Sequence, residues 1–214
     1  MYSLFTYKVD AMKAIQLLVA RGEYVKYTHG VIPKNKLKSM LFKMEDRYRI
    51  NATKQMRYRA KQKGNTNSKI VLLQENDMVY FWLMATNGNG VICDLENLLD
   101  VTDKNNRIEI TGYELIRVKK TKITWTWRIT RDNYSDFEKR IKTACRRKNE
   151  KLIEQCYFSL QHMPVFSEMR KQSFALFKLL QAEYLRSHKS PYPKQLVKCF
   201  YGRFTIATTA KQIK

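Results

Sequence analysis

The chain lacks the motifs that cysteine usually builds. It has four cysteines, and no two of them form a C-x-x-C pair, which argues against a zinc knuckle or a thioredoxin-type redox site. Cys145 and Cys156 are separated by eleven positions, or about three helical turns. We therefore expect both on one face of a single helix, as small buried hydrophobic residues.

Long hydrophobic runs are also missing. The apolar run at residues 14–20 is short and follows Asp10, which does not fit a secretory leader. No run approaches the length that a membrane span requires. We therefore expect a reduced protein of the cytoplasm that has no membrane partner.

Enzyme motifs are scarce as well. The three histidines have no metal-binding spacing, and neither a G-x-S-x-G sequence nor a dinucleotide fingerprint is present. The Asn-Gly-Asn-Gly sequence at 87–90 lacks the Gly-Lys-Ser/Thr ending and the following helix of a phosphate-binding loop, so we interpret it as a tight turn. The best candidates for Mg²⁺ ligands are Asp94 and Glu96, followed by Asp100 and Asp103. A metal-dependent nuclease is therefore an alternative function. Such acids are more often surface charges, and we expect no catalytic residue, no metal and no cofactor.

Positive charge is what the chain has in excess. It carries 41 Lys and Arg against 19 Asp and Glu, a net charge of +22 over 214 residues. With 44% hydrophobic residues it can still bury a core, as one large domain or two small ones. A polyanion would relieve the self-repulsion of such a fold, and nucleic acid is the commonest polyanion, with an anionic membrane surface as its competitor.

The segment from Ile108 to Thr130 has the clearest local pattern. In its second half Ile123, Trp125, Trp127 and Ile129 alternate with polar residues, which is typical of a half-buried strand. We expect a β-hairpin over this segment, with lysines at its tip and the two tryptophans in the core rather than stacked on bases.

The remaining pattern predicts an α+β fold: basic N-terminal helices, a central antiparallel β-sheet with a cationic hairpin, and C-terminal amphipathic helices. We expect helices after Asp10 and Pro33, and a third helix capped by Asn51 or Thr53. Strands are expected at 70–73, 78–84 and 91–93, followed by one long helix from Ser135 to Met163 and another from Ser167. The expected regions are 1–64 (basic helical), 65–131 (antiparallel sheet) and 132–214 (C-terminal helical), or all of these as one compact domain.

Basic residues are interleaved with tyrosine in the predicted N-terminal helices. Eleven basic residues lie between Lys34 and Lys63 against two acids, whereas residues 74–114 contain eight acids and two bases. Phosphates attract Arg and Lys, and an exposed Tyr can stack on a base. The predicted nucleic-acid contacts are Lys36, Lys38, Lys43, Arg47, Arg49, Lys54, Arg57, Tyr58, Arg59, Lys61, Lys63, Lys119, Lys120, Lys122, Arg140, Arg146, Arg147 and Arg203.

These observations favour a non-catalytic protein that binds DNA or RNA, together with other proteins of a nucleoprotein assembly from a mobile genetic element, phage or plasmid. Besides the nuclease, a further alternative is a subunit that binds an acidic protein partner. A helix-turn-helix in residues 10–63, with 34–48 or 53–63 as its recognition helix, is a further alternative, but the connection at 24–33 is too long for a tight turn.

Overall fold

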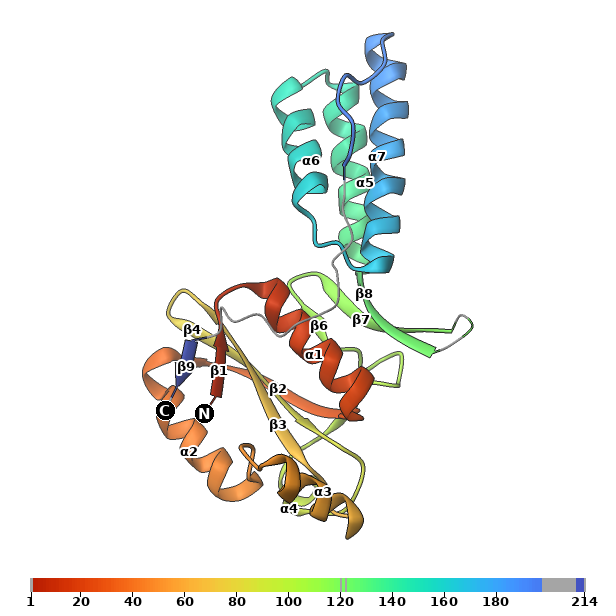
Figure 1. Cartoon of the computed structure of the whole chain (residues 1–214). Coiled ribbons are helices and arrows are strands. Elements are labelled where there is room, and N and C mark those ends of the chain that lie inside the picture. The colour runs from red at the N-terminus through yellow and green to blue at the C-terminus, as the bar shows by residue number, and fades with distance from the viewer. Residues whose placement is uncertain (1, 120, 122, 198–210, 214) are drawn as a thin grey trace. The chain divides into compact units, whose positions relative to one another are not determined.

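The computed structural model describes residues 2–119, 121, 123–197 and 211–213, and its fold is α+β, as the sequence predicts (Figure 1). The chain divides into two compact units. The first contains Met1–Ile108 and Phe204–Lys214, and the second contains Glu109–Arg203. This division falls at residue 108, whereas the regions expected from the sequence meet at residues 64 and 131, so the early strands and the hairpin belong to different units.

A six-stranded sheet forms the centre of the first unit, in the order β5-β2-β4-β3-β1-β9. Its strands are β1 (Tyr2–Phe5), β2 (Lys26–Pro33), β3 (Ser68–Glu75), β4 (Met78–Ala85), β5 (Leu99–Asp100) and β9 (Lys211–Ile213). The expected antiparallel pairing holds for β3 and β4. Strand β2, which lies in the region expected to be helical, also pairs antiparallel with β4, but β1 runs parallel to β3, so the sheet is mixed. The sequence did not predict β1, because a four-residue strand is too short to show a period.

Helices cover both faces of this sheet. Leu37 and Leu41 of α2 (Leu37–Tyr48) belong to one core cluster with Leu72, Val79 and Leu83 of the central strands. The alternate side chains of the same strands, which point to the other face, are also buried, and α1 (Lys8–Gly22) packs against β3 there. The sheet is therefore buried on both sides, which explains why its strands are apolar at consecutive positions instead of alternating.

One expected strand of the first unit is a helix instead. The segment expected as a strand at 91–93 forms the short helix α4 (Val91–Leu95), of which only Ile92 is buried. A run of three apolar residues does not distinguish a strand from a helical turn, because it is too short to show either period.

The second unit contains the predicted hairpin. Strands β7 (Tyr113–Lys119) and β8 (Ile123–Ile129) pair antiparallel, and β6 (Glu109–Ile110) adds a short third strand. Trp127 is fully buried against Phe166, with the ring centroids 6.4 Å apart, which confirms its core role. Ile123 is half exposed, so the apolar face of β8 is buried only toward its C-terminal end.

Three helices complete the second unit: α5 (Arg131–Arg146), α6 (Glu150–His162) and α7 (Ser167–His188). The prediction of one long helix from Ser135 was wrong, because the chain turns at Lys148 (φ 50°) and Asn149 caps α6 by accepting from the Leu152 amide at 3.1 Å. Cys145 and Cys156 therefore lie on different helices, although both are buried as expected. No helix of the described part of the chain is long and apolar enough to span a bilayer.

Helix ends in this glycine-poor chain use charged residues where glycine is common. Glu23, Arg49, Lys148 and Lys189 all adopt the left-handed conformation directly after or near the last helical turn. Three of the four are basic, and a cation at this place is favoured by the partial negative charge of the helix C-terminus. These residues adopt a positive φ at a cost in local conformational energy. The cationic side chains of three of them lie near the helix carbonyls that have no partner within the helix.

Candidate nucleic-acid interface

The basic stretch between Lys34 and Lys63 folds into the 3₁₀ turn η1 (Lys34–Lys36), α2 and α3 (Lys54–Gln62). Ten of its eleven cations are exposed, and Arg57 is half-buried. We call the ten exposed cations the α2–α3 basic surface: Lys34, Lys36, Lys38, Lys43, Arg47, Arg49, Lys54, Arg59, Lys61 and Lys63. Helix α2 can expose its cations because Leu37, Leu41 and Tyr48 share the opposite, buried face.

None of the residues of helix α3 is fully buried. Polar contacts, among them a cap at its N-terminus, hold it in place. Of the two expected caps, Asn51 and Thr53, it is Thr53 that caps the helix, accepting from the Met56 amide at 3.3 Å. Asn67, which precedes β3, donates from its side chain to the Arg57 carbonyl at 3.1 Å. An apolar face would anchor such a helix more firmly, so a helix with no fully buried residue is unusual for a structural element.

Arg57 differs from the other basic residues of α3. Its guanidinium donates to the Ala52 carbonyl in the α2–α3 connection. Its charge also acts on Lys69 of β3: burial is the main cause that lowers the pKa of Lys69, and the positive charge of Arg57 lowers it further. Arg57 was expected to be an exposed contact, but in the structure it ties α3 to the body of the first unit.

Two acids near this surface, Glu45 and Glu23, have partners within the first unit. Glu45 accepts hydrogen bonds from the Tyr2 hydroxyl at 3.1 Å and from the Asn51 amide at 2.9 Å. Burial, reinforced by Glu45, raises the pKa of Tyr2 to about 12, so this phenol stays protonated and continues to donate. Glu23 pairs with Lys61 at 2.6 Å, but both side chains are well exposed, so this pair contributes at most about 1 kcal/mol.

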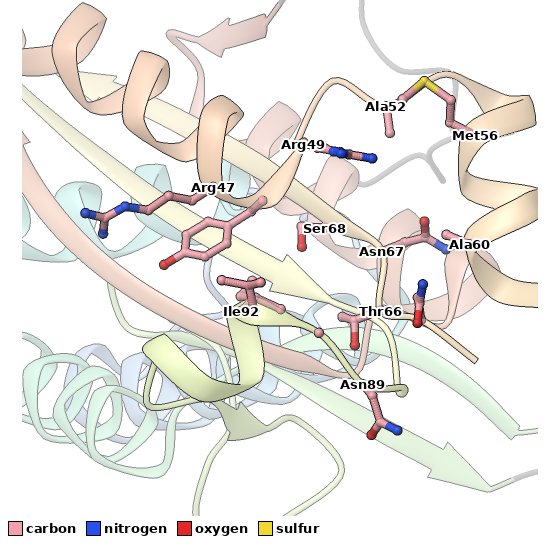
Figure 2. A pocket seen from close by; sticks show the side chains of 14 residues that line it. Arg47, Arg49, Ala52, Met56, Ala60, Thr66, Asn67, Ser68, Asn89 and Ile92 are labelled. Atoms are coloured by element: carbon pink, nitrogen blue, oxygen red, sulfur yellow. The ribbon is translucent and has the colours of Figure 1, made fainter. Parts of the chain in front are cut away.

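A cleft of about 290 Å³ opens beside the basic surface, within the first unit (Figure 2). Four segments line it: Arg47–Arg49 at the end of α2, three residues in and before α3, the loop into β3, and the loop into α4. The lining residues are Arg47, Tyr48, Arg49, Ala52, Met56, Ala60, Asn65, Thr66, Asn67, Ser68, Asn89, Gly90, Val91 and Ile92. They include two guanidinium groups and three side-chain amides but no carboxylate, so the cleft suits a partner that is both anionic and rich in hydrogen-bonding groups.

One wall of the cleft is built from two asparagine- and glycine-containing loops. The Thr66 amide donates to the Asn89 carbonyl and the Asn89 amide to the Gly64 carbonyl, both at 3.0 Å. Gly88 has φ 139°, and a side chain there would collide with the Gly64 carbonyl. The sequence interpretation of 87–90 as a turn without a following helix was wrong in one respect, because α4 begins directly after Gly90.

Tyr48 supports the cleft and does not stack on its outer surface. It is buried, and its hydroxyl donates to Glu96. Burial raises the pKa of Tyr48, and the hydrogen bond to Glu96 acts in the same direction, while Arg47 opposes both. Of the two Arg-Tyr-Arg sequences, the first therefore has its tyrosine in the core, whereas Tyr58 of the second is 65% exposed.

The four acids considered as Mg²⁺ ligands do not gather in one place. Asp100 accepts from the Thr102 amide and hydroxyl, and Asp103 accepts from the Asn105 amide, so each shapes its own turn. Among the residues that the structure describes, no three His, Cys, Asp or Glu side chains form a group that could hold a metal ion.

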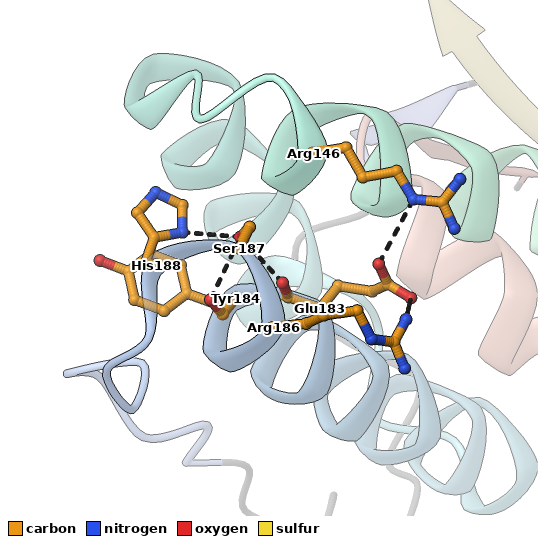
Figure 3. A network of polar contacts seen from close by, with 6 residues as sticks. All are labelled: Arg146, Glu183, Tyr184, Arg186, Ser187 and His188. Atoms are coloured by element: carbon orange, nitrogen blue, oxygen red, sulfur yellow. Dashed lines mark hydrogen bonds and ion pairs between the residues drawn. The ribbon is translucent and has the colours of Figure 1, made fainter.

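The other predicted contacts lie in the second unit or outside the described residues. Lys119, Arg140 and Arg147 are exposed, whereas Lys120, Lys122 and Arg203 lie outside the described residues. Arg146 faces the buried carboxylate of Glu183 at 3.6 Å, and Arg186 donates to the same carboxylate at 2.7 Å (Figure 3). Arg146 therefore has a structural partner, because two cations compensate a buried negative charge.

Sequence reasoning missed two apolar residues of this region. Phe42 on α2 is 77% exposed and Met56 on α3 is 45% exposed. The helical period could have predicted the exposure of Phe42. It follows Leu41 immediately and therefore lies outside the apolar face formed by Leu37, Leu41 and Tyr48. An exposed phenylalanine among cations can stack on a nucleic-acid base.

Comparison with known proteins gave no relationship: no protein-family model, no curated protein sequence and no solved structure matches this chain.

Proposed function

We propose that this chain is a non-catalytic nucleic-acid-binding protein and that the α2–α3 basic surface is its principal contact. The observation that carries the proposal is the solvent exposure of ten cations on one turn and two short helices, in a stretch of sequence with only two acids. Cations in this arrangement neutralise successive phosphates and release condensed counterions, which is the main source of affinity for a polyanion.

The chemistry of the surface favours phosphates over scattered carboxylates. Arg47, Arg49 and Arg59 offer planar guanidinium groups that can fork onto phosphate oxygens. Phe42 and Tyr58, 77% and 65% exposed, add aromatic faces that an acidic protein does not require but that bases can stack on. The surface thus combines the two kinds of contact that single-stranded nucleic-acid binders use.

A place within a nucleoprotein assembly of a mobile genetic element, phage or plasmid, in the cytoplasm, is part of this proposal and is supported by composition alone. In such an assembly the exposed cations of the second unit, Lys119, Arg140 and Arg147, would provide secondary phosphate contacts.

The test is a salt titration with three labelled polyanions: duplex DNA, single-stranded RNA and poly-glutamate of similar total charge. If about six to eight phosphates are neutralised, log K against log salt should slope by roughly −5 to −7 on duplex DNA, from ~0.9 per phosphate. Affinity for either nucleic acid should exceed that for poly-glutamate by at least about tenfold at equal salt. Equal affinity for poly-glutamate would favour an acidic protein partner, and nucleic-acid affinity that does not respond to salt would refute the proposal.

A further inference from the structure

We infer that the cleft beside the α2–α3 basic surface takes up one unpaired nucleotide, with its phosphate at Arg49 and its base against the Asn65 and Asn89 wall. This inference rests on the proposed function and identifies the substrate class of that site: nucleic acid with an unpaired nucleotide, in a single strand, at an overhang or in a loop.

The size of the cleft limits what can enter it. A volume of about 290 Å³ corresponds to roughly ten water molecules at ~30 Å³ each. This is enough for one flat base with part of its sugar and phosphate, and a base in a duplex is held between its stacked neighbours. A nucleotide must therefore leave the stack to enter, which an unpaired nucleotide does at the lowest cost in free energy.

The lining of the cleft matches the three parts of a nucleotide. Arg49 supplies positive charge for the phosphate where the lining contains no carboxylate, whereas the Arg47 side chain points to the other side of the end of α2 (Figure 2). Met56 and Val91, 45% and 53% exposed, supply apolar surface that a base could cover. Apolar groups beside guanidiniums are expected for a ligand that is flat and uncharged at one end and anionic at the other.

Hydrogen-bonding groups for the edge of the base come from the two loops. Asn65 and Asn89 are exposed in the cleft, and within the described part of the chain neither side-chain amide has a hydrogen-bond partner. An asparagine amide can donate and accept at once, which matches the edge of a base and adenine in particular.

The cleft is rigid enough to bind without much ordering. Its loops are joined by the two backbone hydrogen bonds between residues 64–66 and Asn89, and Gly88 lets their backbones approach closely. Asn67 is fixed to the Arg57 carbonyl at 3.1 Å, which ties the loop wall to α3. Preformed walls lower the conformational entropy that the protein loses on binding, so a single nucleotide can contribute measurably to affinity.

The experiment compares two probes with the same number of phosphates, each made in DNA and in RNA: a blunt duplex of about 16 base pairs, and a shorter duplex that carries an overhang of about four adenines. Wild-type protein should bind the overhang probe about tenfold more tightly than the blunt duplex. The double variant Asn65→Ala/Asn89→Ala should reduce this ratio to about twofold or less, because it removes both amides while the backbone hydrogen bonds of the loops remain.

The matched control is Asn105→Ala, an exposed asparagine of the first unit that does not line the cleft, and it should keep the wild-type ratio. Circular dichroism verifies that every variant is folded. Salt-dependent binding with equal affinity for both probes would overturn the unpaired-nucleotide inference and leave the proposed function standing. A preference that survives the double variant would overturn the inference as well, by placing the nucleotide elsewhere. Failure to bind any probe would refute the proposed function itself.

Discussion

The sharpest test of the contact surface is the double variant Arg47→Gln/Arg49→Gln. Both side chains are exposed, both line the cleft, and glutamine keeps most of their length while removing the charge. A hydrogen bond to a charged group contributes about 1–2 kcal/mol when it is partly solvated, so the pair should cost about 2–4 kcal/mol of binding free energy. That cost corresponds to a loss of about 30-fold or more in affinity.

The salt dependence gives a second, independent magnitude for the same variant. Loss of two phosphate contacts should make the slope of log K against log salt shallower by about 1.8, from ~0.9 per contact on duplex DNA. Fluorescence anisotropy at four or more salt concentrations measures affinity and slope together. Thermal melting should change little, because neither guanidinium is buried.

The matched control is Arg117→Gln/Lys119→Gln on the hairpin strand β7, where both side chains are also exposed. This pair removes the same charge from the second unit and should cost less than half as much binding free energy. If the hairpin variant loses as much affinity as the α2 variant, or more, the principal contact lies on the second unit and the reasoning from the α2–α3 basic surface is wrong.

Three further predictions concern stability. Arg57→Ala should lower the free energy of unfolding by about 1 kcal/mol, measured by urea denaturation, because it removes a hydrogen bond to a backbone carbonyl, and its binding should fall less than that of the α2 double variant. Gly112→Ala should cost at least about 1 kcal/mol and lower the melting temperature, because Gly112 has φ 79° and a Cβ there would overlap the Asn133 side chain; an unchanged melting temperature would contradict the geometry. Burial raises the pKa of Cys145 from 9.0 to about 11, so the thiol ionises in the unfolded state before it ionises in the folded state. The free energy of unfolding should therefore fall as the pH rises from 9 to 11. In Cys145→Ala, measured by urea denaturation at each pH, it should fall less over that interval.

Several elements of this fold could be predicted because their causes are local. The alternation at Ile123–Ile129 predicts a strand, since every second side chain of a strand points to the same face. Thr53 predicts the start of α3, because its hydroxyl can satisfy an amide that the helix leaves free. The α+β class and the basic character of the first helices follow from patterns of this kind.

Other elements were missed because neighbouring sequence does not determine them. The apolar pattern of α5 continues into α6, so the turn at Lys148 depends on Asn149 capping and on the packing of Cys145 and Cys156 from separate helices. Strand β1 exists because β3 offers it a parallel partner, and four residues alone carry no such information.

The sequence alone determined the charge of the basic surface, since eleven cations against two acids over thirty residues cannot be neutralised within that segment. The tertiary structure decided which of those cations face solvent and what stands beside them. Ser68 pairs with Ala85 in the β3–β4 register, so the loop before β3 and the loop after β4 emerge at the same end of the sheet. Tyr48, the last residue of α2, packs in the core cluster and brings the end of α2 to that place, while Arg57 turns inward to hold α3. A cleft made by residues 47–92 therefore depends on strand register and core packing, which act between positions that are distant in the chain.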